Sequence, residues 1–323
     1  MRRSTPLIAA AAVVAAGVTA ASASIVQKPK QGELSVIALV GSTAGAQTLQ
    51  NIDSFKPQTP RSTRAVTGTT AGDVLLGVDF RPSTGELIGL ARNGTALRTY
   101  GIDYQTGTAT LKGTLTSTGI ANGGAAAGQP VVADPAAVYS IDVNPTSPGG
   151  STIATDQRGA LRIVSSTGQN LRVANIDAPA TTTDAPINVG TAATVAGVQG
   201  VGYTNSEPKA NLSTGTLLYD INVATDSLHL QNPANAGDVS TVVGKLDLQA
   251  GGTPVDITSA AFDVYPYYAG GRAVSNVGVA VLGSSTGKIL ARVDLTSGLA
   301  VSQGPVSADI VDIAALYPQK YQG

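Results

Sequence analysis

The chain has 323 residues, no cysteine, one histidine, and 20 basic against 21 acidic residues. The missing cysteines exclude disulfides, thiolate metal sites, a cysteine nucleophile and a lipid-modified cysteine. The near-zero net charge gives no electrostatic reason to expect nucleic acid or an anionic membrane surface as a partner. Charged residues are only 13% of the chain and glycines number 38, a composition that suits short strands joined by tight turns.

The first residues have the organisation of a secretory signal. Arg2 and Arg3 form a basic start, an apolar run extends from Leu7 to Ala21, and Ala21-Ser22-Ala23 is a small-residue cleavage site. A membrane-spanning helix would need about 20 apolar residues, and this run has about 15. We predict a signal peptide at 1–23 and an N-terminal lead at 24–33. The mature protein is then secreted to an extracellular or cell-envelope location, without membrane insertion.

A strand-like octet recurs along the rest of the chain. The first, fourth and sixth residues of each copy are mostly apolar, and the third is small or polar. The starting positions are separated by 63, 60, 59 and 53 residues. A period of this size, built of short strands, is typical of a propeller blade. The copies are Leu75–Pro82, Val138–Pro145, Val198–Asn205, Ile257–Val264 and Ile310–Tyr317.

The two ends of the repeat array indicate how it closes. Hairpin signals such as Gly101–Gly107 follow most octets, so each unit reads as a four-stranded meander. Only Pro318–Gly323 remain after the last octet, whereas Ser35–Val40 and Thr48–Asp53 have strand character without a preceding octet. We predict one all-β domain at 34–318, a five-bladed β-propeller closed by pairing of its N- and C-terminal strands, which removes the exposed edges that an open array would leave at its two ends. A pair of sandwiches or a solenoid is the alternative.

Three stretches resemble a bacterial secreted family, the domain of unknown function 4394. They are Leu75–Leu90, Leu161–Val173 and Gly202–Gln231, and the likeness runs over most of residues 34–317. The resemblance implies a propeller fold and export. It implies no activity, because none is established for the family. Ser166 stands where the family commonly has an acid, so any role of that acid does not carry over to this chain.

Asp79 and Asp142 occupy equivalent places in two octets, within strands expected to surround the central channel. Burying a carboxylate without a partner costs roughly several kcal/mol of folding free energy, so each of these side chains must contact a hydrogen-bond donor, a metal ion or water. One reading is that each caps backbone donors of a neighbouring turn. The other is that both reach the channel mouth and bind a cation or sugar hydroxyls. The third copy has Gly202 at this position and the last two have alanine, which excludes a symmetric ring of acids.

The most polar cluster surrounds a turn at Thr167-Gly168 and consists of Arg162, Gln169, Asn170 and Arg172. The two arginines, on one face of paired strands, could clamp a carboxylate or a phosphate bidentately. Alternatively, the two amides satisfy backbone groups of the turn and of a neighbouring blade.

Because His229 is the only histidine in the sequence, a metal site with several imidazole ligands is excluded. It alternates with Leu228 and Leu230, so we predict an ordinary histidine on a surface or half-buried strand face.

These features favour a binding or interaction module over an enzyme. The expected partner is an unidentified small molecule, a glycan or an envelope protein. We expect a monomer, no nucleic acid and no cofactor; metal binding is left open. The competing reading is an extracellular glycoside or lactone hydrolase that uses the central channel, for which no catalytic residue is assigned.

Overall fold

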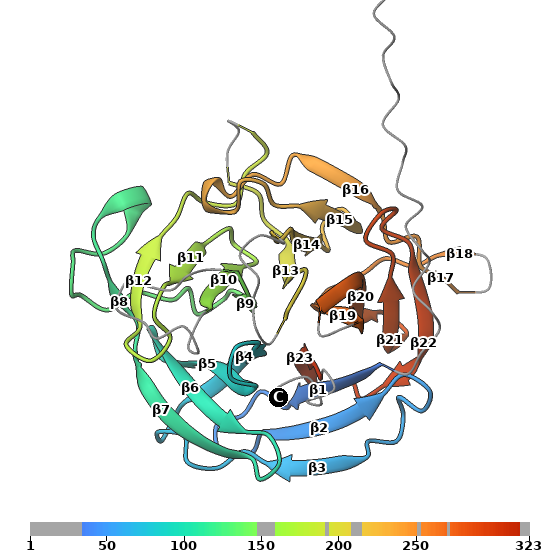
Figure 1. Cartoon of the computed structure of the whole chain (residues 1–323), viewed down its shortest axis with the longest axis horizontal. Helices are drawn as coiled ribbons and strands as arrows, with labels where there is room; N and C mark the ends of the chain where they lie inside the picture. Colours follow the sequence, from blue (N-terminus) through green and yellow to red (C-terminus); the bar gives the residue numbers. More distant parts are fainter. Residues whose placement is uncertain are drawn as a thin grey trace, which may run out of the picture.

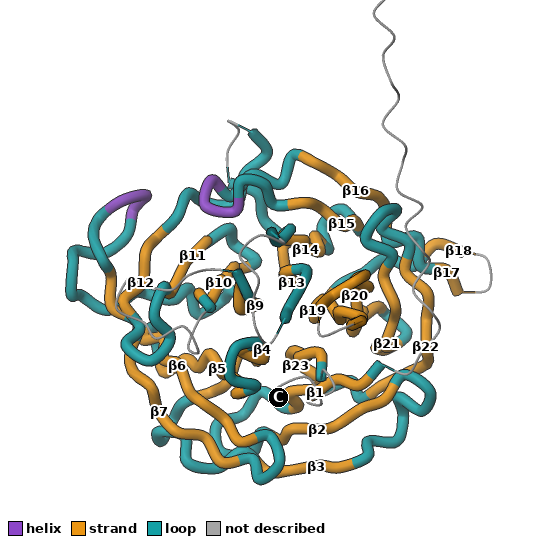
Figure 2. Tube along the Cα trace, in the orientation of Figure 1, coloured by secondary structure: helices purple, strands orange, loops and turns teal. Residues whose placement is uncertain are grey.

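The computed structural model describes residues 34–146, 159–190, 194–207, 215–250, 253–269 and 272–316. The predicted signal peptide at 1–23 and the lead at 24–33 lie outside the described residues. Within the described part of the chain, strands and loops dominate, with short 3-10 helices at η1 (Ala121–Gly123) and η3 (Ala234–Ala236) (Figure 2). None of the helices in this part is long and apolar enough to cross a membrane.

Five sheets stand around a common centre, like the blades of a propeller (Figure 1). Each blade is an antiparallel meander whose first strand is innermost, and parallel β8 (Thr116–Ser117) extends the third blade at its outer edge. A separate hairpin joins β17 (Gln249–Ala250) to β18 (Thr253–Pro254). The five-bladed propeller predicted from the octets is confirmed.

The strands of the blades, each given from the innermost outward, have the following bounds. Blade 1 contains β23 (Ile310–Ala315), β1 (Ser35–Val40), β2 (Thr48–Asp53) and β3 (Ser62–Ala65); blade 2 contains β4 (Val74–Arg81), β5 (Glu86–Asn93), β6 (Ala96–Asp103) and β7 (Thr108–Thr114). Blade 3 contains β9 (Tyr139–Asn144), β10 (Ala160–Ser165), β11 (Asn170–Val173) and β12 (Ala180–Thr183). Blade 4 contains β13 (Val198–Tyr203), β14 (Leu218–Asn222), β15 (Ser227–Leu230) and β16 (Thr241–Lys245); blade 5 contains β19 (Ser259–Ala269), β20 (Arg272–Ser284), β21 (Gly287–Val293) and β22 (Ala300–Val306).

Blade 1 is built from both ends of the chain. The C-terminal strand β23 pairs antiparallel with β1, so that Val36 lies opposite Ala315 and Ala38 lies opposite Ile313. The backbone continues this pairing beyond the strand, where the N–H of Leu316 donates to the carbonyl of Ser35 over 2.8 Å. The predicted closure by terminal strands is therefore confirmed.

The hydrophobic core is divided among the spaces between neighbouring blades. A cluster of buried apolar side chains fills each of the five interfaces between the described blades. Between blades 2 and 3, for example, Ile88 and Leu90 of β5 pack with Ile141 of β9 and Ile163 of β10. Apolar residues on both faces of a blade therefore become buried, which explains why the strands carry apolar residues at more than alternate positions.

Candidate functional site

Asp79 of β4 and Asp142 of β9 lie on the innermost strands, and each is only 2% exposed. The carboxylate of Asp79 accepts the backbone N–H of Val143, on the next blade, over 2.7 Å. The backbone N–H of Tyr203, on the blade after that, donates to Asp142 in the same way. The backbone donors capped by these side chains thus belong to neighbouring innermost strands and not to turns.

A third aspartate, Asp263 of β19, repeats this arrangement. Its Oδ2 accepts the N–H of Ala315 over 2.6 Å, again on the innermost strand of the next blade. The fourth octet is therefore Ser259–Pro266, two residues later than predicted from apolar spacing. In that frame Asp263 matches Asp79 and Asp142, and the assignment of alanine to this position in the fourth copy is corrected. The third and fifth copies keep glycine and alanine there.

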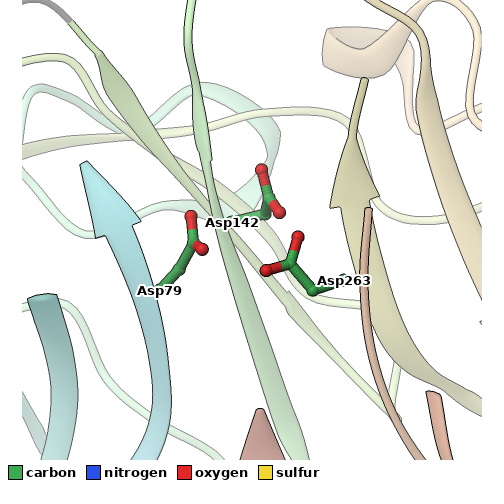
Figure 3. Close-up of side chains that lie close together, drawn as sticks. All are labelled: Asp79, Asp142 and Asp263. Atoms are coloured by element: carbon green, nitrogen blue, oxygen red, sulfur yellow. The ribbon is translucent and has the colours of Figure 1, made fainter. Parts of the chain in front are cut away.

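The three carboxyl groups converge at the centre of the ring (Figure 3). One oxygen from each lies within 4.8 Å of one oxygen from each of the others. The Oδ1 atoms of Asp79 and Asp142 are buried, and no described residue donates a hydrogen bond to them. Burial and the neighbouring carboxylates raise the pKa of both groups well above the ordinary value, and burial raises the pKa of Asp263 to about 6. We call Asp79, Asp142 and Asp263 the central aspartates.

A second row of acceptors lies at the third position of the octet. Asp312 of β23 accepts the N–H of Val78 over 2.9 Å, and the hydroxyl of Ser140 accepts the N–H of Val201 over 3.1 Å. Both bonds again join the innermost strand of one blade to that of the next. Comparison of the octets did not identify Asp312, because the residues at the same position of other copies are small, such as Ser140 and Gly77.

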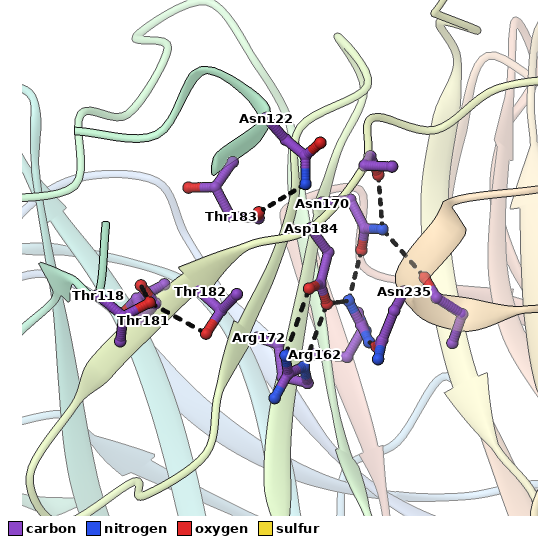
Figure 4. Close-up of polar contacts among 12 residues, drawn as sticks. Thr118, Asn122, Arg162, Asn170, Arg172, Thr181, Thr182, Thr183, Asp184 and Asn235 are labelled. Atoms are coloured by element: carbon purple, nitrogen blue, oxygen red, sulfur yellow. Dashed lines mark hydrogen bonds and ion pairs between the residues drawn. The ribbon is translucent and has the colours of Figure 1, made fainter. Parts of the chain in front are cut away.

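Arg162 of β10 lies in a buried polar network between blades 3 and 4 (Figure 4). Its Nη1 donates to Asn170 over 2.7 Å and to Asp184 over 2.8 Å, and its Nη2 donates to Asn235 over 2.7 Å. The amide of Asn170 donates in turn to the backbone carbonyls of Ala185 and Ala234. Asn170 therefore satisfies backbone groups of neighbouring segments, which is the structural interpretation given for its amide in the sequence analysis.

Arg172 of β11 shares the carboxylate of Asp184 with Arg162. Its Nε lies 3.2 Å from Asp184 Oδ2, and its side chain is 33% exposed against 2% for Arg162. Gln169 does not join this network, because its amide contacts the hydroxyl of Tyr139 and the carbonyl of Val132. Asp184 and Asn235 carry no repeat signal in the sequence, so sequence reasoning missed both.

A pocket of about 440 Å³ adjoins this network. Among its described lining residues, Arg162 and Arg172 are the charged ones, and the polar remainder are amides and hydroxyls. These polar residues are Asn144, Thr146, Tyr203 and Asn235. The pocket therefore presents two guanidinium groups, whose shared counter-ion Asp184 is 6% exposed.

His229 of β15 is 6% exposed, so the predicted surface or half-buried position is wrong. Its Nδ1 donates to the carbonyl of Val239 over 2.8 Å, and its Nε2 lies 3.1 Å from the hydroxyl of Ser227. The segment after β15 returns over the histidine and covers it, which strand alternation alone could not show. Burial lowers the pKa of His229. The ring has a structural role in fixing that segment.

Comparison with curated proteins gives no match. Among solved structures, the chain is similar to a chain of a nidogen/laminin complex, with 8% identity, a TM-score of 0.42, and 88% of this chain and 99% of that chain covered. It is also similar to the major allergen Mala s 1 of Malassezia sympodialis, with 11% identity, a TM-score of 0.37, and 88% and 79% covered. A putative 6-phosphogluconolactonase from Bacteroides uniformis matches with 11% identity, a TM-score of 0.35, and 87% and 99% covered. Likenesses this weak carry no argument about function.

The family comparison is more direct. The model of the domain of unknown function DUF4394 matches residues 48–314, which span β2 to most of β23 and include the three central aspartates and both pocket arginines. The chain belongs to the DUF4394 family.

Proposed function

We propose that this chain is an exported binding module that takes a small anionic molecule in the pocket beside Arg162 and Arg172. The observation that carries the proposal is a charge imbalance. Among the described residues, the two guanidinium groups share one carboxylate, that of Asp184. Asp220 also interacts electrostatically with Arg162, but burial raises its pKa to about 8, so at neutral pH it is mostly uncharged and a positive charge is left beside the pocket. A carboxylate or phosphate group on the ligand would neutralise that charge and match the planar fork of an arginine.

The two arginines have different parts in this proposal. Arg162 is almost fully buried and its Nη atoms are engaged by Asn170, Asp184 and Asn235, so it supports the pocket wall. Arg172 is partly exposed and contacts the ligand. The hydroxyl of Tyr203 and the amides of Asn144 and Asn235 suit a ligand that also carries hydroxyl groups, such as an acidic sugar.

Arg172→Gln tests the proposal, because it removes the exposed charge and retains a polar side chain of similar length. We expect a panel of acidic and neutral glycans and sugar phosphates to show saturable binding of an acidic member, weakened about tenfold or more by the substitution. Titration calorimetry provides the measurement. Arg61→Gln is the matched control, since Arg61 is another partly exposed arginine paired with one aspartate, Asp53, on blade 1. Equal binding by Arg172→Gln and wild type would contradict the proposal.

Measurement of substrate turnover distinguishes the alternative function, a hydrolase, from the binding module. The central aspartates are 2% exposed, so a substrate could reach them only after a rearrangement of the ring. Continuous release of product from a chromogenic glycoside or lactone would favour the hydrolase, whereas saturable binding without turnover favours the module.

Export belongs to the same proposal and rests on the N-terminal sequence, with its basic start and apolar run. Mass spectrometry of protein from the producing cells should give a mature chain that begins at Ser24. An intracellular protein that retains Arg2 and Arg3 would contradict this part of the proposal.

A further inference from the structure

The central aspartates have features that the ligand pocket does not explain. Each carboxylate is fixed by a backbone N–H of the next blade: Asp79 by Val143, Asp142 by Tyr203, and Asp263 by Ala315. Because these bonds hold the side chains in place, the carboxyl groups remain turned toward one another at the centre of the ring (Figure 3).

Two buried oxygens in this cluster, Asp79 Oδ1 and Asp142 Oδ1, have no hydrogen-bond partner among the described residues. The side-chain contacts of Asp79 and Asp142 within the cluster are with another carboxyl group, that of Asp263. Leaving a buried charged acceptor unsatisfied is strongly unfavourable, so such atoms normally meet a donor, an ion or water. Both belong to buried side chains whose carboxyl groups lie near one another, with one oxygen of each carboxyl group within 4.8 Å of the others (Figure 3).

The charges around these oxygens also require compensation. Among the described residues, the carboxyl groups of Asp79 and Asp263 act electrostatically on Asp142, and both carry charge of the same sign as Asp142. The anchoring backbone N–H bonds favour the ionised form of a carboxyl group. A divalent cation would neutralise two of the three negative charges and fill the coordination of both unpartnered oxygens.

We propose that Asp79, Asp142 and Asp263 bind one divalent cation of the size of calcium and thereby link blades 2, 3 and 5. The ligands are all oxygens, which hard cations prefer, and calcium takes about six to eight of them at roughly 2.4 Å. Oxygens on opposite sides of such an ion lie about 5 Å apart, so the separations within 4.8 Å are compatible with one shared ion. Three carboxylates supply three to six ligands, and backbone carbonyls or water supply the rest. This proposal does not depend on the pocket beside Arg172.

Metal content and thermal unfolding of the full mature chain test the site. Protein purified with calcium chloride and then desalted should contain about one calcium per chain by elemental analysis. Chelation with EDTA should lower the Tm by about 5 to 10 °C, since an ion bound only to the folded chain stabilises it. Manganese and magnesium, added separately to the chelated protein, rank the preference for cation size.

Asp142→Asn keeps an acceptor oxygen for the N–H of Tyr203 but removes one negative charge, so it should fold and lose both the ion and the effect of EDTA. Asp312→Asn is the matched control. Asp312 is equally buried and accepts an N–H from the next blade, but it lies outside the trio, so this variant should keep the ion.

If Asp142→Asn does not fold, the metal content of the wild-type chain still tests the proposal. A wild-type chain without a stoichiometric ion and with the same Tm in calcium and in EDTA overturns the proposal and shows that the carboxyl groups share protons instead. Retention of the EDTA effect in Asp142→Asn, or its loss in Asp312→Asn, also overturns it.

Discussion

Asp220 of β14 is a completely buried carboxyl group, and neither of its oxygens has a hydrogen-bond partner in the part of the chain that the structure describes. Burial raises its pKa to about 8, although the charge of Arg162 acts in the opposite direction. In the unfolded chain the same group has a pKa of about 3.9. Between these values the folded state holds a proton that the unfolded state releases, so this residue makes the folded state less stable as pH rises from about 4 to 8. Above pH 8 its effect is constant.

Asp220→Asn removes this titration and should change the pH profile in a defined direction. Relative to wild type, the variant should gain stability between pH 5 and pH 8, by about 4 kcal/mol at most, because each pH unit in the window contributes about 1.4 kcal/mol. Urea unfolding at the two pH values measures the difference, and effects of other groups cancel in the comparison with wild type. Asp103→Asn is the control, since Asp103 is exposed and backbone hydrogen bonding lowers its pKa, which places its titration below this range. Parallel profiles for Asp220→Asn and wild type would show that Asp220 is ionised in the fold.

At the scale of elements, the octet predicted the innermost strands because every copy performs the same packing task, with apolar residues facing both neighbouring blades. The copy at Ile257 was misplaced because Ser259 and Ala260 are poor in apolar bulk, so spacing alone favoured an earlier start. Pro266, which matches Pro82 and Pro145, carried the information that fixes the correct frame. Asp184 and Asn235 could not be predicted, because their positions beside Arg162 arise from contacts between segments that no local pattern relates.

The small third residue of the octet follows from close contact between innermost strands. At Gly200, a Cβ atom would lie 2.6 Å from the Cβ of Phe262 on the next blade, a contact that requires the backbone or a stiff part of a side chain to shift. We expect Gly200→Ala to lower the free energy of unfolding by about 1 to 3 kcal/mol, as overpacked cores do. Chemical denaturation provides the measurement. Gly119→Ala is the control, because no atom lies within 4 Å of its added Cβ and its backbone needs no positive φ. Equal stability of the two variants would mean that the blades have room to separate.

At the scale of the whole molecule, the ring depends on the strand that the C-terminus contributes to blade 1. β23 supplies Ile310, Ile313 and Ala315 to the cluster between blades 5 and 1, and it accepts or donates the hydrogen bonds of one edge of β1. Burial of each isoleucine contributes about 2 kcal/mol, and a domain has only about 5 to 15 kcal/mol in total. Removal of 309–323 should therefore abolish cooperative thermal unfolding, whereas removal of 317–323 alone should retain it. Scanning calorimetry of both truncations decides, and an unchanged transition after the longer truncation would contradict closure by β23.

Moving β23 instead of deleting it separates the role of the strand from the role of the chain's end. The antiparallel register places Ala315 beside Val36, so the end of β23 and the start of β1 are adjacent and a two-residue Asn-Gly turn can join them as a hairpin. A chain in which residues 309–316 precede residue 35 through this turn, and which ends at 308, should recover a cooperative transition, at a Tm below that of the wild type because it lacks the buried Leu34. Its β23 can still place Asp312 against Val78 and Ala315 against Asp263.

A control with the same rearrangement and Ile313→Asp should not recover the cooperative transition, because it buries a charge in the cluster between blades 5 and 1. Failure of the rearranged chain, with the truncated chain also unfolded, would mean that blade 1 needs a covalent connection from β22 to β23 and that strand pairing alone does not close the ring.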